Sequence, residues 1–278
     1  MRAMQFSGTF YASGKSELAK FIEEAVSHAD VKAKHGSAVK AIVAPHAGYV
    51  YSGSIAAYSY KALMEDREHG KPDTAIILGP NHTGLGEPIA VSMEDWATPF
   101  GTVKNDKKLS KAIIGSSKYI SEDESAHSEE HSIEVQLPFL KYLFPDTAAC
   151  FICQGDQSLD ASILLSKAVI AAAKESGKRI AVIASSDFNH YEPASAAKEK
   201  DSRLLAAIEK LDSDEFNSSV LETGDSACGI GPITVAMEYS KANGVPKATL
   251  LRYGNSGEAT MDYSSVVAYS AIGFYGAV

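Results

Sequence analysis

The chain alternates short apolar runs of strand length with longer segments in which apolar residues recur at helical spacing. Three runs rich in Ile, Val and Ala cover residues 40–45, 74–80 and 180–186. Helical patterns between such runs include residues 160–176 and 231–243. Strand and helix patterns that alternate along a chain are typical of a parallel sheet with crossover helices. We therefore predict an α/β fold with a mostly parallel central sheet.

The remaining segments extend this alternation to both ends of the chain. Further helices are expected near residues 54–64, 107–114, 132–144, 193–211 and 213–222, and further strands near residues 88–92, 101–103, 147–153, 248–253 and 264–275. Residues 96–99 look exposed, and Pro138 predicts a kink within its helix. Because no composition break, linker or repeat divides the chain, we expect a single domain spanning residues 1–278.

Each of the three apolar runs leads through a short polar turn to a histidine. These residues are His46, His82 and His190. Open parallel sheets bind ligands in the crevice beyond the carboxyl ends of their strands. If the three runs are neighbours in the sheet, their imidazoles meet there and form a metal or acid–base site. A hydrogen bond within its own turn would explain a single histidine, but the repeated placement favours a site.

Two further side chains extend this candidate site. Cys228 lies in a Gly-rich turn that opens a helix, where the helix dipole and backbone N–H groups stabilise a thiolate. A thiolate beside imidazoles binds iron, zinc or copper well and disfavours magnesium or calcium. Packing as a small buried residue is an equally good interpretation of Cys228. Asp187 is a candidate to orient His190 for general acid–base catalysis, the alternative being an Asp-capped turn with a surface histidine.

Two shorter motifs favour structural roles. Residues 127–131 match the H-x-x-E-H pattern of zinc peptidases, but a helix cap made by Ser128 or Glu130 explains them more simply. Cys150 and Cys153 match C-x-x-C within a predicted strand, where positions three apart point to opposite faces. We therefore predict that both cysteines are core residues.

Composition narrows the classes of function. The formal net charge of −9 and a pI near 5.4 argue against a nucleic-acid-binding surface. Apolar stretches stop well short of the roughly 18 residues that a membrane span needs. The first residues also lack the apolar core of a signal peptide. Three cysteines in 278 residues fit a reducing compartment better than a disulfide framework, so we expect a cytoplasmic protein.

Several multi-residue blocks together resemble the Memo family, also called AmmeMemoRadiSam system protein B. The blocks cover residues 7–11, 45–49, 52–53, 78–82, 130–138, 185–190 and 228–229. The resemblance implies a single-domain three-layer sandwich like that of class III extradiol dioxygenases, such as protocatechuate 4,5-dioxygenase. It also implies an association with a radical-SAM protein. One departure is Ala12, where the family usually has proline, and it affects only the N-terminal turn.

The resemblance also implies roles for individual residues. The related dioxygenases hold ferrous iron with two histidines and a glutamate, and a further histidine is the acid–base catalyst. By motif, His46 and His82 look like the ligand histidines, and His190 looks like the acid–base histidine. Cys228 looks like the third ligand, in the place of the carboxylate. Fe(II) is therefore the favoured metal, with zinc or copper as alternatives.

Other residues are expected at the walls of the crevice. By resemblance, His131 and Glu134 would line or support it. Tyr49 and Tyr51 follow a predicted strand and are candidates for the pocket wall, although packing is the commoner role of such aromatic residues. The ligand would be a small molecule or a peptide.

Three classes of function remain open. The first is a mononuclear iron redox enzyme related to the dioxygenases, although a thiolate ligand is open to attack by oxygen and argues against ring cleavage. The second is a zinc-dependent hydrolase in which His190 serves the attacking water. The third is a binding or adaptor protein that keeps the crevice without turnover.

Overall fold

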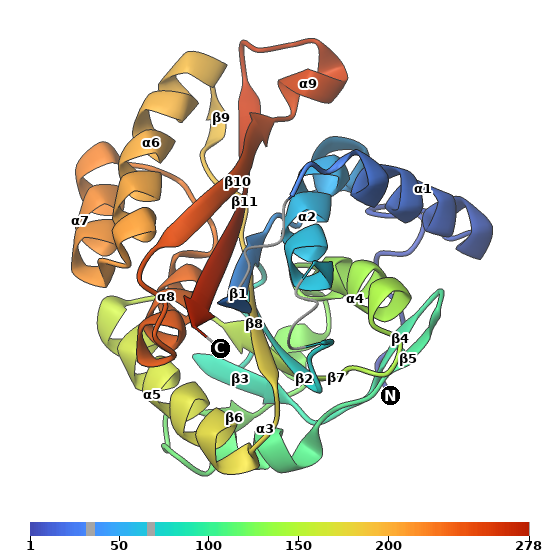
Figure 1. Ribbon diagram of the computed structural model, residues 1–278, viewed down its shortest axis with the longest axis vertical. Helices are drawn as coiled ribbons and strands as arrows, with labels where there is room; N and C mark the ends of the chain where they lie inside the picture. The colour runs from blue at the N-terminus through green and yellow to red at the C-terminus, as the bar shows by residue number, and fades with distance from the viewer. Residues whose placement is uncertain (32–36, 66–69, 278) are drawn as a thin grey trace.

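The computed structural model describes residues 1–31, 37–65 and 70–277, and a large mixed sheet forms its centre (Figure 1). The strands of this sheet are β1 (Ser37–Ala44), β2 (Thr74–Pro80), β3 (Ile89–Ser92), β6 (Ser121–Glu122), β7 (Ala148–Gln154), β8 (Ile180–Ser185), β9 (His190–Glu192), β10 (Ala248–Asn255) and β11 (Val266–Ala277). Their order is β10-β11-β1-β8-β2-β7-β3-β6, and β9 pairs with β11 outside this path. Strands β4 (Trp96–Thr98) and β5 (Gly101–Val103) form a separate hairpin.

The middle of the sheet is parallel, as predicted. β1, β8, β2 and β7 run in the same direction, whereas β11 is antiparallel to β1 and β3 is antiparallel to β7. Ala44 pairs with Ser185 at the carboxyl ends of β1 and β8, and Leu78 pairs with Ala184 in β2 and β8. The three strands that lead to His46, His82 and His190 are therefore consecutive in the sheet and end at one edge.

Helices cover both faces of the sheet and make a three-layer architecture (Figure 1). The helices are α1 (Lys15–His28), α2 (Tyr49–Met64), α3 (Lys107–Ile114), α4 (Leu137–Leu143), α5 (Leu159–Ser176), α6 (Ala194–Lys210), α7 (Ser213–Thr223), α8 (Ile230–Ala242) and α9 (Gly257–Thr260). One apolar core joins α1, α2 and α4 to the sheet, and the other joins α3, α5, α6, α7 and α8. Successive strand residues such as Ile42 and Val43 enter opposite cores, as the two-residue period of a strand requires.

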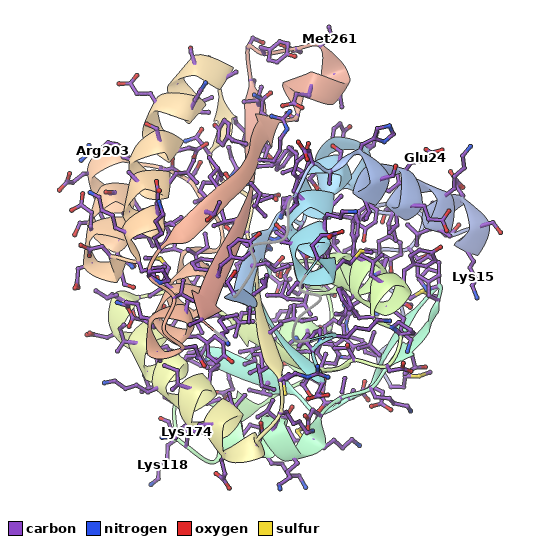
Figure 2. All side chains as sticks on the ribbon, in the orientation of Figure 1. Lys15, Glu24, Lys118, Lys174, Arg203 and Met261 are labelled. Atoms are coloured by element: carbon purple, nitrogen blue, oxygen red, sulfur yellow. The ribbon has the colours of Figure 1, made fainter. Side chains whose placement is uncertain are left out.

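The two strand cysteines follow the same rule. Cys150 lies in the core beneath α3 and α5, and Cys153 lies in the opposite core. Both are fully buried, so the prediction that they are core residues is confirmed. On the outside, the charged side chains of Lys15, Lys174 and Arg203 project away from α1, α5 and α6 (Figure 2).

Three local predictions were wrong. Helix α2 begins at Tyr49, directly after Gly48, rather than near residue 54. Trp96 is buried, with its ring stacked on Phe151 and the Arg2 guanidinium 4.1 Å from its centre. Pro138 causes no kink, because it lies in the first turn of α4, where its missing N–H is not needed.

Within the described ranges, no helix combines the length and apolar character needed to cross a membrane.

Candidate metal centre

Four histidines gather beyond the carboxyl ends of β1, β2 and β8. His46 and His82 each follow the end of their strand by two residues, and His190 begins β9. His131 joins them from the segment before α4, and all four line a crevice of about 530 Å³. The donor atoms of His46, His82 and His131 all lie within 4.8 Å of one another. The predicted convergence of strand-end histidines is therefore found, with His131 as an added member.

A hydroxyl group sets the tautomer of His46. The Nδ1 atom of this buried imidazole lies 2.8 Å from Ser185 Oγ. The single proton of Ser185 is donated to the Ser132 carbonyl at 2.7 Å, and the Gln136 amide donates to Ser185 at 2.9 Å. Ser185 must therefore accept from His46, so Nδ1 carries the proton and Nε2 has a free lone pair. The bond joins β1 to the end of β8, rather than staying within the histidine's own turn.

Glu130 holds two of the other imidazoles. Its Oε1 atom lies 3.0 Å from His82 Nδ1 and 3.3 Å from His131 Nδ1. The carboxylate also accepts the backbone N–H groups of His82 and Ser132. Burial opposes ionisation of Glu130, but the hydrogen bonds and charge of His82 outweigh it and lower the pKa to about 2. The hydrogen bond on His82 Nδ1 leaves Nε2 of that ring available to a ligand, the usual arrangement behind metal-binding histidines, and the carboxylate lies close to the His131 ring as well.

Glu130 corrects our interpretation of the motif at residues 127–131. Its carboxylate anchors histidines instead of capping a helix. The only sequence signal for this role was the position of Glu130, an acidic residue directly before His131. His127, the first residue of the motif, is buried against Trp96, so the structure does not use the motif as a zinc-peptidase pair.

Burial favours the neutral imidazole for two histidines of the cluster, His46 and His131. Burial and the neighbouring His131 and His82 lower the pKa of His46 well below its ordinary value. Burial lowers the pKa of His131 to about 4. Three imidazoles whose donor atoms converge are a donor set that fits a transition-metal ion, and imidazole binds such an ion in its unprotonated form.

Cys228 meets this cluster at His46. Its Sγ atom lies 3.3 Å from His46 Nε2 and accepts the backbone N–H of Asp187 at 3.2 Å. The residue sits just before α8, in the Gly-rich turn that the sequence indicated. Burial and the nearby Asp187 carboxyl raise the pKa of Cys228 well above its ordinary value. These surroundings favour the thiol over the thiolate in the protein alone, and the three converging donor atoms belong to His46, His82 and His131, so the role of Cys228 as a thiolate ligand stays a prediction.

His190 is oriented by Ser226 and not by Asp187, so the predicted pairing is wrong. Its Nδ1 lies 3.0 Å from the Ser226 carbonyl, and its backbone N–H donates to Ser226 Oγ at 2.8 Å. The carbonyl can only accept, so His190 carries its proton on Nδ1. Burial lowers the pKa of His190, which favours a neutral base in the crevice wall.

Asp187 serves the other side of the site. It accepts the backbone N–H of His46 at 2.8 Å and also that of Ala47. Burial nevertheless raises the pKa of Asp187 to about 7. Since Asp187 also lines the crevice, it can hold or release a proton there near neutral pH.

Glu134 supports the crevice from behind. Its carboxylate pairs with the Arg2 guanidinium and accepts the backbone N–H of Phe6 and the Tyr11 hydroxyl, both at 2.8 Å. These bonds fix the N-terminal segment, which places Phe10 against the His131 ring with centroids 4.6 Å apart. Glu134 therefore supports the crevice, which is one of its two predicted roles, but does not line it.

Tyr49 is a packing residue, and the prediction that it lines the site was wrong. Its ring lies in the core beside Phe21 and Phe139, and its hydroxyl donates to the Val135 carbonyl at 2.8 Å. At the start of α2, Tyr51 points the other way and lines the crevice. Tyr49 and Tyr51 are two positions apart in α2, so the helical rotation between them turns their side chains in nearly opposite directions.

Sequence reasoning missed most of the aromatic residues that line the crevice beside the histidines. Phe10, Tyr191 and Tyr269 line the crevice with Tyr51. Tyr191 has a φ angle of 63° and is 77% exposed. A left-handed tyrosine is strained and has no recognisable sequence signature, so only the fold could reveal it.

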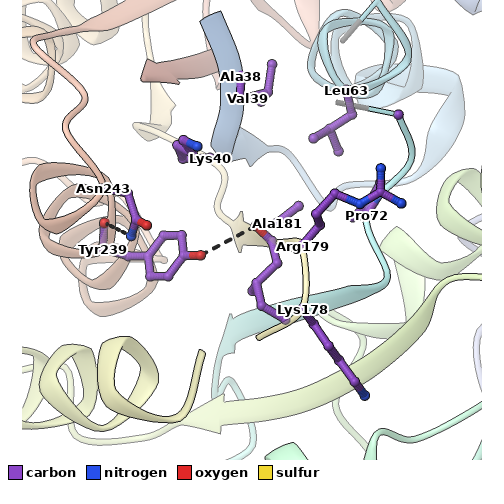
Figure 3. A pocket seen from close by; sticks show the side chains of 12 residues that line it. Ala38, Val39, Lys40, Leu63, Pro72, Lys178, Arg179, Ala181, Tyr239 and Asn243 are labelled. Atoms are coloured by element: carbon purple, nitrogen blue, oxygen red, sulfur yellow. Dashed lines mark hydrogen bonds between the residues drawn. The ribbon is translucent and has the colours of Figure 1, made fainter. Parts of the chain in front are cut away.

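A second cavity, of about 220 Å³, lies at the opposite end of the sheet (Figure 3). Lys40, Lys178 and Arg179 surround it. Lys178 pairs with Asp106 at 2.6 Å, and Arg179 pairs with Asp73 at 3.4 Å. These partners neutralise two of the three cations, so the cavity is a weaker anion site than its lysines and arginine suggest.

Comparisons with known proteins agree with this architecture. A crystal structure of an uncharacterized protein from Escherichia coli K12 superposes with a TM-score of 0.57 at 12% sequence identity, covering 84% of this chain and 99% of that one. At this identity the likeness concerns the fold alone.

Closer relatives cover nearly the whole sequence. A MEMO1 family protein of Methanosarcina acetivorans is 42% identical over 273 residues, which is 98% of each chain. One from Desulfurococcus amylolyticus is 44% identical over 278 residues, or 97% of each chain. The family model described as Memo-like protein matches residues 2–273. With the fold, the histidine cluster and these matches in agreement, the chain belongs to the Memo family.

Proposed function

We propose that this protein is a mononuclear metalloprotein, with iron as the favoured metal, and that it acts as a non-haem redox enzyme related to class III extradiol dioxygenases. The observation that carries the proposal is the convergence of three imidazoles, with donor atoms within 4.8 Å of one another, in a crevice where the Cys228 sulfur lies 3.3 Å from His46 Nε2. His46 and His82 are ligands both in this iron site and in the alternative zinc site described below. When bound, a redox-active iron would supply open coordination positions for a substrate and for dioxygen.

Cys228 is the proposed third ligand of the iron site. Its sulfur lies 3.3 Å from His46 Nε2, the nitrogen that the Ser185 bond leaves unprotonated. A thiol in this position loses its proton when a metal binds, since the thiolate is the ligating form. Two imidazoles and one thiolate favour iron or copper over hard cations.

His190 is the proposed proton carrier of the site. With Nδ1 bonded to the Ser226 carbonyl, its Nε2 lone pair can take a proton from a ligand in the crevice. Asp187 offers a second position for a proton, because its pKa of about 7 allows both forms at neutral pH. The aromatic residues that line the crevice would hold a small molecule or a peptide side chain against His190 and Asp187.

His131 supports a second candidate function, a zinc-dependent hydrolase. Three histidines are a ligand set used by catalytic zinc, and His131 contributes the third donor atom of the group. In this version His190 would serve as general base toward the attacking water. Cys228 would then be a neighbour of the site rather than a ligand.

Metal analysis of matched variants distinguishes these proposals. We would purify wild type, His46→Ala, His82→Ala, His131→Ala and Cys228→Ala under anaerobic conditions, with exposed His28→Ala as the control. The iron proposal expects iron in wild type and in His28→Ala, its loss in His46→Ala, His82→Ala and Cys228→Ala, and oxygen uptake by the wild type.

The outcomes separate cleanly. Zinc that depends on His131 and survives Cys228→Ala, without oxygen uptake, would establish the hydrolase instead. Metal content that is the same in all four site variants would refute the metal centre itself.

A further inference from the structure

A second buried acidic group lies beneath the crevice, outside the set of residues discussed so far. Asp201 in α6 is fully buried. It accepts the backbone N–H of Asn189 at 3.1 Å and the Tyr253 hydroxyl at 2.6 Å. Its carboxyl group neighbours that of Asp225, whose buried Oδ2 atom has no other hydrogen-bond partner among the described residues and can therefore accept a proton held by Asp201. Two buried carboxyl groups in contact must hold a proton between them, because two adjacent charges repel.

This carboxyl pair is bonded to both loops that carry the chemistry. Asn189, the partner of Asp201, directly precedes His190. Asp225 accepts the backbone N–H of Ala227 at 2.8 Å, and Ala227 directly precedes Cys228. Each carboxyl group therefore fixes the backbone N–H of the residue that directly precedes a candidate functional residue.

The same two loops are also joined directly. The backbone N–H of Cys228 donates to the Asp187 carbonyl at 3.3 Å, and that of His190 donates to Ser226 Oγ at 2.8 Å. Separation of the carboxyl pair would therefore strain the contacts that orient His190 and bring the Cys228 sulfur to His46.

The surrounding charges favour a shared proton. Burial and the charge of Asp225 raise the pKa of Asp201 to about 8. Tyr253 in β10 stays a donor, because burial and Asp201 raise its pKa. The other titratable groups nearby are His190, which interacts with Asp225, and the Lys200–Glu192 ion pair at 2.7 Å.

We propose that Asp201 and Asp225 are positioning residues, whose proton-sharing pair braces the His190 loop against the Cys228 loop and so assembles the metal site. The proposal rests on the proposed function, since it assigns the brace a role in metal binding. It predicts that the neutral, hydrogen-bonded pair favours binding and that the doubly charged pair opposes it.

The test compares Asp201→Asn with Asp201→Ala, using Co²⁺ added anaerobically to metal-free protein between pH 6.5 and 9.5. Asparagine keeps a neutral donor toward Asp225 at every pH but gives up one of the two acceptors that bind the Asn189 N–H and the Tyr253 hydroxyl, whereas alanine removes all of these bonds. Dividing the affinity of each variant by the wild-type affinity at the same pH cancels the pH dependence that comes from ordinary deprotonation of the ligands. The readouts are the dissociation constant, the thiolate-to-cobalt absorption and the melting temperature, with exposed Asp160→Asn as the matched control.

We expect Asp201→Asn to bind Co²⁺ like wild type at pH 7 and about tenfold more tightly than wild type at pH 9, where the raised pKa of Asp201, about 8, leaves this group mostly ionised in wild type. Asp201→Ala should weaken binding about tenfold at pH 7 and reduce the thiolate band, even where it is folded. An Asp201→Asn to wild-type affinity ratio that does not change with pH would overturn the proposal. So would a folded Asp201→Ala protein with wild-type affinity.

The rate of Cys228 alkylation by iodoacetamide reports on the Cys228 turn without any metal. It can therefore test the carboxyl pair even if the proposed metal site is wrong. The other two cysteines are fully buried, so the reaction reports on Cys228. If Co²⁺ binding is unaffected by His46→Ala and Cys228→Ala, the metal site fails. A faster alkylation in Asp201→Ala but not in Asp201→Asn would still establish the brace, and equal rates in both would refute it.

Discussion

At the scale of single residues, acceptors facing Nδ1 determine what each histidine can do. Ser185 faces His46, Glu130 faces His82, and the Ser226 carbonyl faces His190. The sequence pattern predicted the histidines, because each follows an apolar run. It could not predict most of their partners, since Ser185 lies 139 residues from His46 and Glu130 lies 48 residues from His82.

Removal of the Glu130 carboxylate should weaken metal binding strongly. In Glu130→Ala, His82 loses the group that fixes its tautomer and ring orientation, and His131 loses a carboxylate 3.3 Å from its Nδ1 atom. Loss of such a partner typically lowers metal affinity about 10- to 100-fold. Titration of metal-free protein with Co²⁺ would measure this change, and Glu129→Ala is the control, because the neighbouring glutamate is exposed. An affinity equal to that of the control would show that Glu130 does not support the metal site.

At the scale of elements, the ends of the central strands and helices were harder to predict than their existence, and helix α1 (Lys15–His28) was not predicted at all. The periodic patterns gave α3 and α5 nearly to the residue, because both have an apolar face and a capping side chain. The pattern failed at α2, whose small residues Ser52 and Gly53 are buried and give no amphipathic contrast. It failed at residues 132–136 because that segment turns as a 3₁₀ helix around the site.

Asp106 should be a strong stability determinant, because it ties several elements together. It caps α3 through the Leu109 N–H and also accepts the Thr74 hydroxyl and the Lys178 ammonium group. Replacement by alanine removes the cap and leaves the buried Thr74 hydroxyl without this acceptor, so we expect a loss of about 2–3 kcal/mol in the free energy of unfolding at pH 7. Urea unfolding would measure it, with exposed Asp160→Ala as the control.

The pH dependence of this effect has a definite sign. Burial opposes ionisation of Asp106, but its bonds to Lys178 and Thr74 outweigh burial and lower its pKa. A carboxylate whose pKa is lower in the folded state stabilises the fold above its ordinary pKa and loses that effect as the pH falls through the lower value. The difference between Asp106→Ala and wild type should therefore shrink below about pH 4. A difference that is constant from pH 7 to pH 3 would contradict the assignment.

At the scale of the whole molecule, the site exists because the sheet order is not the sequence order. β1, β8 and β2 are neighbours, although β8 follows β2 by about a hundred residues along the chain. The strand-end rule for parallel sheets was enough to predict that their histidines meet. It gave no information on the N-terminal segment, which is held at the crevice by the Glu134 bonds and by the Tyr49 N–H, which donates to the Phe10 carbonyl at 2.7 Å.

The close packing of the Cys228 turn on the end of β8 should make Gly229 irreplaceable. A Cβ atom at Gly229 would lie 2.6 Å from the Ser185 carbonyl oxygen and 2.5 Å from Ser186 Cβ. Backbone atoms cannot yield as a flexible side chain can, so Gly229→Ala must push α8 and Cys228 away from β8 and His46. We expect a loss of several kcal/mol in stability, in the range of overpacked cores, together with weaker metal binding. Thermal unfolding and Co²⁺ titration would measure both, with Gly14→Ala as the control, because its nearest contact would be an ordinary 3.7 Å. Wild-type stability and wild-type cobalt affinity in Gly229→Ala would mean that the turn can move away from β8 without disturbing the site, which is incompatible with Cys228 as a ligand held in place by the fold.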